Sequence, residues 1–201
     1  MALDGNVIGH DDILKSIPQS VQALRQLKVQ PAECAGFAQV DYSKAVANAA
    51  LGAIVAHPTE PTKSVAVSVI SYVSSDLAPQ ESVAQDQADL ARCPAYTMQL
   101  GGISLRGTMK AVDVAVPGVE AIGVVTDIEA PNVSQRTVMV RATRGPLRIA
   151  VIVGAGGMTE AAAVQRAQDI AAVTVVALDG GPSVSLTAPP SRAGSNAGSS
   201  A

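Results

Sequence analysis

The stretch RIAVIVGAGGMTEAAAVQRAQDI, residues 148–170, constrains this chain most, because a strand, a glycine turn and a helix follow one another there. A dinucleotide-binding fold begins in the same way, but its turn carries three glycines. Gly154 and Gly156 match the first two, whereas Thr159 holds the third position. An acidic residue should also end a second strand about 20 positions on. Asp179 meets that requirement only if VTVVAL, residues 173–178, is a strand.

The length of chain after the turn separates two interpretations of this stretch. A nucleotide fold needs further strand and helix units downstream. After residue 178 the sequence reads DGGPSVSLTAPPSRAGSNAGSSA, which is too rich in Gly, Pro, Ser and Ala to order itself. We therefore predict a flexible tail over 180–201 and a strand that reverses through the turn into a terminal helix. A small nucleotide-cofactor enzyme that uses the Gly154–Gly157 turn is the alternative.

The terminal helix is predicted to run from Thr159, a suitable N-cap, to Leu178. Apolar residues recur within it at helical spacing and should face a sheet. They are Val164, Ala167, Ala171, Val175 and Leu178.

Upstream, prolines and apolar periodicity divide the chain into further elements. We predict short helices over residues 1–30, a helix over 43–57 that Gly52 weakens, and a helix over 80–93 that Pro94 stops. Val65, Val67 and Val69 alternate with small residues and predict a half-buried strand. Five more strands are expected at 95–100, 109–116, 119–128, 135–142 and 147–153.

Short connections between these strands imply antiparallel hairpins. With 48% hydrophobic residues, a chain of 201 residues can bury one substantial core. The predicted fold class is thus α+β, an antiparallel β-sheet packed by helices, in a single domain with a long C-terminal helix. We place an N-terminal helical segment at 1–30, the α+β domain at 31–179 and the tail at 180–201.

Composition and charge exclude several classes of function. The net charge is −3 and Lys and Arg do not cluster, so nucleic acid is not an expected partner. Aromatic residues make up only 2% of the chain, which leaves little material for base stacking or an aromatic cage. The longest apolar stretches, 45–56 and 171–178, are shorter than the roughly 20 residues that cross a bilayer. Residues 1–12 also lack the pattern of a signal peptide.

Residues with catalytic or metal-binding potential are sparse. His10 and His57 have no acidic or cysteine neighbours at ligand spacing, so no metal site is predicted. No serine lies in a GxSxG elbow, and we predict no catalytic residue, no cofactor and no enzymatic activity. Four arginines recur along two adjacent predicted strands, as a solvated sheet face or as an anion-binding surface. They are Arg136, Arg141, Arg144 and Arg148.

The two cysteines, Cys34 and Cys93, are too far apart in sequence for a CxxC motif. They are either two buried free thiols or a disulfide that closes a loop of about 60 residues. A disulfide would place the protein outside the cytoplasm.

Several stretches in this order resemble one family. They are PAECAG near the start, SVAVSVISYVSS with the following helix PQESVAQDQADLARCPAYTMQL, and the closing LRIAVIVGAGGMTEAAAVQRAQDIA. Together they resemble the extracellular sensor-like domain of mycobacterial receptor serine/threonine kinases of the PknH type, which a set of mycobacterial lipoproteins shares. The resemblance covers most of residues 30–178. It departs from the family in lacking a second cysteine pair and the aromatic residues around the pairs.

The resemblance implies that Cys34 pairs with Cys93, because the two occupy the family's cysteine positions. It also implies a sheet packed by helices with a concave face for a small ligand. The expected function is a non-catalytic, extracytoplasmic ligand-binding or sensor-like domain, either secreted or a lipoprotein of the cell envelope. Its partner would be a small ligand or an envelope component, and membrane contact would come only through an N-terminal lipid anchor that this chain lacks. A pocketless interaction module of the envelope is the further alternative.

Overall fold

The computed structural model describes residues 5–38, 46, 49–57, 59–60, 62–73, 83–100, 102–131 and 133–180. The tail predicted beyond residue 180 and the start of the helix predicted at 80–93 lie outside these ranges.

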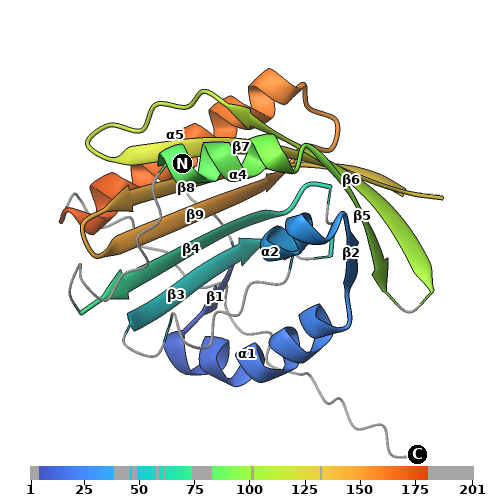
Figure 1. Cartoon of the computed structure of the whole chain (residues 1–201). Coiled ribbons are helices and arrows are strands. Elements are labelled where there is room, and N and C mark those ends of the chain that lie inside the picture. Colours follow the sequence, from blue (N-terminus) through green and yellow to red (C-terminus); the bar gives the residue numbers. More distant parts are fainter. Residues whose placement is uncertain are drawn as a thin grey trace, which may run out of the picture.

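One antiparallel sheet of nine strands forms the body of the molecule (Figure 1). The strands are β1 (Asn6–Ile8), β2 (Lys28–Gln30), β3 (Ala49–Ala56), β4 (Val65–Tyr72), β5 (Ala95–Leu100), β6 (Ile103–Val112), β7 (Glu120–Ala130), β8 (Val133–Arg144) and β9 (Leu147–Gly154). Their spatial order is β1-β3-β4-β9-β8-β7-β6-β5-β2, so β8 is the central strand and β9 lies next to it. From β5 to β9 each strand pairs with the next in sequence, as the short connections predict.

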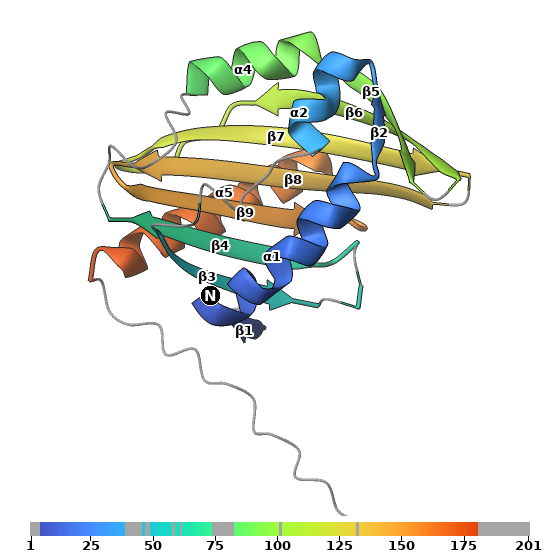
Figure 2. The ribbon, with the colours of Figure 1, turned by 60° about the horizontal axis from the view of Figure 1, so that its bottom comes forward.

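Helices cover both faces of this sheet. Helix α5 (Glu160–Leu178) packs on one face against β8 and β9. The opposite face carries α1 (His10–Arg25), α2 (Ala35–Ala38) and α4 (Val83–Arg92), as Figure 2 shows with α5 behind the sheet. The predicted α+β class, with its antiparallel sheet and long C-terminal helix, is therefore confirmed.

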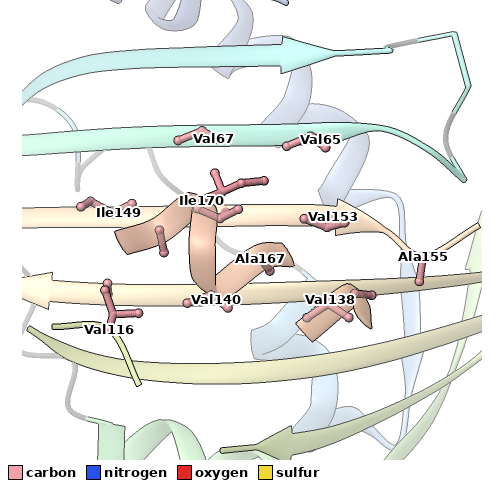
Figure 3. Close-up of a cluster of buried hydrophobic side chains, with 14 of the residues drawn as sticks. Val65, Val67, Val116, Val138, Val140, Ile149, Val153, Ala155, Ala167 and Ile170 are labelled. Atoms are coloured by element: carbon pink, nitrogen blue, oxygen red, sulfur yellow. The ribbon is translucent and has the colours of Figure 1, made fainter. Parts of the chain in front are cut away.

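The main core lies between α5 and the valine-rich strands beneath it (Figure 3). Ala163, Ala167 and Ala171 recur every fourth residue and are completely buried, because their small side chains let the helix approach the sheet closely. Val138, Val140 and Val151 fill the floor below them. By length and hydropathy α5 could also cross a membrane, but its buried row is that of a helix in a protein core.

The face that α5 turns to the sheet differs slightly from the predicted one. Ala167, Ala171 and Val175 are buried as expected, and Thr159 caps the helix by accepting a hydrogen bond from the Ala162 amide. Ile170 also belongs to the buried row, whereas Leu178 is 45% exposed. The row is rotated because a straight helix of 3.6 residues per turn drifts away from a fixed spacing of seven.

The helix predicted over 43–57 is wrong where the structure describes that segment, because Ala49–Ala56 is strand β3. Alanine favours helix locally, but here β1 and β4 pair with the segment along both of its edges. Gly52, which weakened the helix prediction, lies in the middle of the strand.

The strand predicted at 109–116 begins and ends earlier, at Ile103 and Val112. A tight reversal between Leu100 and Ile103 starts the pairing with β5 at once. Beyond the strand the chain leaves the sheet, and the Ala115 amide donates to Oε1 of Gln168 on α5 at 3.1 Å. Val116 is buried in the core beneath that helix, which explains its strand-like apolar character.

Residues 6–30 form a segment that crosses the sheet from one edge to the other, which we call the strap. β1 pairs with β3 at one edge of the sheet and β2 pairs with β5 at the other, and α1 joins the two. In place of the short helices predicted here there is a single helix that contains Pro18, and it ends at Arg25.

Candidate functional site

The glycine turn does not present its amides to a ligand. The amides of Gly154 and Gly156 donate to the carbonyls of Ser64 and Thr62, and that of Ala155 donates to the carbonyl of Arg136. In a nucleotide fold such amides point at the pyrophosphate. Residues 173–178 are helical, so the second strand that the cofactor alternative requires is a helix here. The turn connects β9 to α5 and anchors the loop before β4.

The histidines lie apart from any acidic cluster. His10 begins α1 at the surface, and His57 follows β3 with a φ of 50°. Within the described residues, no three His, Cys, Asp or Glu side chains gather as they would around a metal ion.

The four arginines that the sequence places on adjacent strands do not share one face. Neighbouring residues of a strand point to opposite sides of the sheet. Arg136 and Arg144 therefore lie on the α5 side, where their partners are Asp127 and Asp179. Arg141 lies on the other side, next to Asp86 of α4. The single anion-binding face considered from the sequence is thus wrong, because the strand alternation divides the set.

Two of these arginines nevertheless meet in a hollow at one end of the sheet. Arg144 and Arg148 flank the β8–β9 turn, and both residues line an open depression of about 500 Å³ at the sheet end, although their side chains leave the sheet on opposite faces. Its other lining residues are Gly118, Val119, Glu120, Thr143 and Gly145. Glycine leaves main-chain groups accessible in this lining, and Thr143 adds a hydroxyl. The lining combines two arginines, which can donate charge-assisted hydrogen bonds to an anion, with one acidic residue, Glu120, which opposes anion binding.

Both guanidinium groups are held in place. Arg144 donates to both carboxylate oxygens of Asp179, with 2.8 Å between Nη1 and Oδ2. The hydrogen bond from Arg144 lowers the pKa of Asp179, and the same bond raises the pKa of Arg144. Arg148 donates from Nη1 to the carbonyls of Gly145 and Leu147, at 2.7 and 3.0 Å. The Arg144 pair is solvent-exposed, and an exposed pair of this kind is weak enough for another anion to displace Asp179.

An open face of the sheet continues from Arg148 along β9 and β4. We use this name for the side chains of the two strands that point away from α5. They are Ala66, Ser68, Ile70, Arg148, Ala150 and Ile152. Tyr72, at the end of β4 on the same face, is buried with Ala49, and Ile70 packs against them. In β9 the contrast between the two faces is large, since Val151 and Val153 are fully buried while Ile152 is 39% exposed. Strand β9 is therefore covered on the α5 side, whereas on the other side Ile152 is exposed and its neighbours are half-buried.

Cys34 and Cys93 are joined as a disulfide in the structure, with 5.5 Å between their Cα atoms. Both are 1% exposed and pack with Val29, next to Tyr96 and Met98. The bond ties the strap to the end of α4.

Sequence reasoning did not find the depression as a site. Arg144 and Arg148 were noted, but Glu120, Thr143 and Gly118 join them only because β7 pairs with β8 in the observed register. The RGP turn between two predicted strands, with an arginine on either side of it, was the available signal.

The fold and the depression together define an α+β domain with a curved sheet and a polar hollow at one end. No family model matches the chain, and no curated protein matches it.

The solved structures that are similar to this chain include two mycobacterial ones. One is the crystal structure of the extracellular domain of PknH from Mycobacterium tuberculosis, with 12% identity, 85% of this chain and 98% of that chain covered, and a TM-score of 0.47. The other is an X-ray structure of the Rv0999 ortholog from Mycobacterium smegmatis, with 14% identity, 75% of each chain covered, and a TM-score of 0.46. The first of these is a domain of the PknH type that the sequence resembles, and at these identities the likeness concerns the fold.

Proposed function

We propose that this chain is a non-catalytic, extracytoplasmic binding domain that takes a small anionic ligand in the depression at the β8–β9 turn. The observation that carries the proposal is the meeting of Arg144 and Arg148 in a hollow of about 500 Å³. That volume lies within the range of small-molecule sites.

Other features support the non-catalytic and extracytoplasmic parts of the proposal. The lining of the depression holds no histidine and no cysteine, the side chains that most often act as base or nucleophile. The amides of the glycine turn already donate to main-chain carbonyls, which argues against the cofactor alternative. The Cys34–Cys93 disulfide favours an oxidising compartment.

Calorimetric titration with inorganic phosphate and with citrate tests the proposal. Arg144→Gln should weaken binding about fivefold to twentyfold, because it removes charge-assisted hydrogen bonds from the depression. Arg136→Gln is a matched control. It removes the same charge from an arginine of similar exposure, 41% against 39%, that also has an aspartate partner but lies outside the depression.

The control should stay within twofold of the unmodified protein. Equal weakening in both variants would show a general charge effect and contradict the site. If neither anion binds the unmodified protein at millimolar concentration, the proposal fails and a pocketless interaction module becomes the better account.

A further inference from the structure

The two faces of β9, an interior strand of the sheet, differ in a way that a fully packed sheet would not show. Ile149, Val151 and Val153 of β9 are at most 3% exposed beneath α5. Ile152, between two of them in sequence, is 39% exposed although three strands lie on one side of β9 and five on the other. A large aliphatic side chain at the centre of a sheet is normally covered.

The strap explains why this face stays open. Because β1 and β2 lie at opposite edges, α1 has to cross the sheet between them (Figure 2). Its 16 residues span about 24 Å, whereas the strands from edge to edge cover about 38 Å along the sheet. Because the helix is shorter than the sheet is wide, the sheet must curve, and α1 spans its concave side in a straight line, held at both ends by β1 and β2.

A straight helix held at both edges of a curved sheet cannot pack closely against the middle of its concave face. Ile13, Ile17 and Leu24 recur along one side of α1 at helical spacing, yet no residue of this helix is buried. Among the described residues, α1 chiefly contacts β3, near one edge of the sheet. The apolar side of the helix is thus only half-buried, and Ile152 on the open face is exposed.

The open face is apolar along most of its length and cationic at one end. On the β4 side Ile152 lies opposite Ala66 and Ala150 lies opposite Ser68, so the floor there is built of small side chains. On the β8 side the neighbours are larger: Met139 lies opposite Ile152, and Arg141, which pairs with Asp86 of α4, lies opposite Ala150. Arg148 begins the same row and also lines the depression. The distance from Arg148 to Ile152 along the strand is about 13 Å.

We propose that the ligand is a single-chain amphiphile. Its anionic head lies in the depression, and its alkyl chain follows the open face along β9 from Arg148 toward Ile152. The inference rests on the proposed function, since it assigns the anion site to the head group. The match between a cationic end and an accessible apolar floor is the complementarity that such a molecule requires.

Titration with acetate, octanoate and dodecanoate, each below its micelle concentration, tests whether the alkyl chain of the ligand contributes to binding. The dissociation constant should fall from acetate to dodecanoate, by up to about fourfold for each methylene that becomes buried. One molecule should bind per chain, and 1-octanol should bind at least tenfold more weakly than octanoate, because it lacks the charge that the arginines recognise.

Ile152→Glu should abolish the gain in affinity with chain length while leaving phosphate binding within twofold. Val173→Glu is the matched control, because Val173 is similarly exposed, at 44%, but lies on α5 on the far side of the sheet. Both side chains are accessible, so neither variant buries a charge, and circular dichroism should show both folded.

The outcomes separate the two proposals. If phosphate or citrate binds but chain length adds nothing, or if both variants lose the gain equally, the amphiphile is wrong and the anion site stands. Equal binding of octanol and octanoate also overturns the anionic head. If no carboxylate binds at any length and neither phosphate nor citrate binds, both proposals fail.

Discussion

Gly156 lies so close to the loop before β4 that a side chain at this position has no room. A Cβ built there would be 2.5 Å from the Thr62 Cβ and 2.5 Å from the Thr62 carbonyl oxygen. The contact includes backbone, which cannot rotate away as the end of a flexible side chain can. The glycine that looks like part of a nucleotide motif is thus required by packing between two segments of the chain.

Gly156→Ala should therefore lower the free energy of unfolding by about 1 to 3 kcal/mol. Gly52→Ala is the control, because its Cβ would meet no atom within 4 Å and its strand conformation suits alanine. The control should change stability by no more than about 0.5 kcal/mol. Urea denaturation followed by circular dichroism measures both, and equal effects would contradict the close approach at Thr62.

At the scale of elements, α5 shows tertiary packing overriding local preference. Residues 173–176 are β-branched and disfavour helix by a few tenths of a kcal/mol each. They are helical all the same, and the Thr174 hydroxyl donates to the carbonyl of Ile170 at 2.8 Å. Burial of the row that contains Ile170 and Val175 offsets that cost, at about 1.5 to 3 kcal/mol for each large side chain.

Ala171→Asp should destabilise the protein by at least about 3 kcal/mol, because Ala171 is completely buried between α5 and the sheet and a carboxylate there has no partner. Asp169→Ala should change the free energy of unfolding by less than about 0.5 kcal/mol. Asp169 is exposed and accepts a hydrogen bond from Gln165 of the same helix. Chemical denaturation that ranks the two in reverse order would show that α5 does not face the sheet as described.

The sequence predicted well those elements in which the apolar periodicity matches the face that the structure buries. The alternation at Val65, Val67 and Val69 identified β4 because one face of that strand meets the core. β3 escaped prediction because AALGAIVA is half-buried on both faces and shows no alternation. The depression could not be predicted because its residues come from different strands, and only the register of β7 and β8 brings Glu120 beside Thr143.

For the molecule as a whole, the disulfide fixes the β2 end of the strap to the rest of the domain. It links η1 (Ala32–Cys34), just after β2, to the residue that follows α4, with a sequence separation of 59. In the chain-entropy model a loop of that length stabilises the fold by about 4 kcal/mol. Without the bond, the β2 edge of the strap would depend on three residues of strand pairing and the contacts of η1 and α2.

Denatured, unreduced protein should accordingly contain no free thiol, and Cys34→Ser should lower the free energy of unfolding by about 3 to 5 kcal/mol. A thiol assay in guanidinium and urea denaturation of the variant measure the two quantities. Two free thiols per chain would contradict both the pairing and the extracytoplasmic location that it supports.

The central claim is that the molecule binds at the β8–β9 end of its sheet and not at its glycine turn. An amide nitrogen–proton NMR titration tests it most directly, because it reports on both places at once. With octanoate or phosphate, the amides of Gly118, Thr143 and Gly145 should shift progressively with ligand, while those of Gly154–Gly157 stay in place for these ligands and for NAD. Shifts concentrated at Gly154–Gly157 on addition of NAD, with none around the β8–β9 turn, would contradict the account.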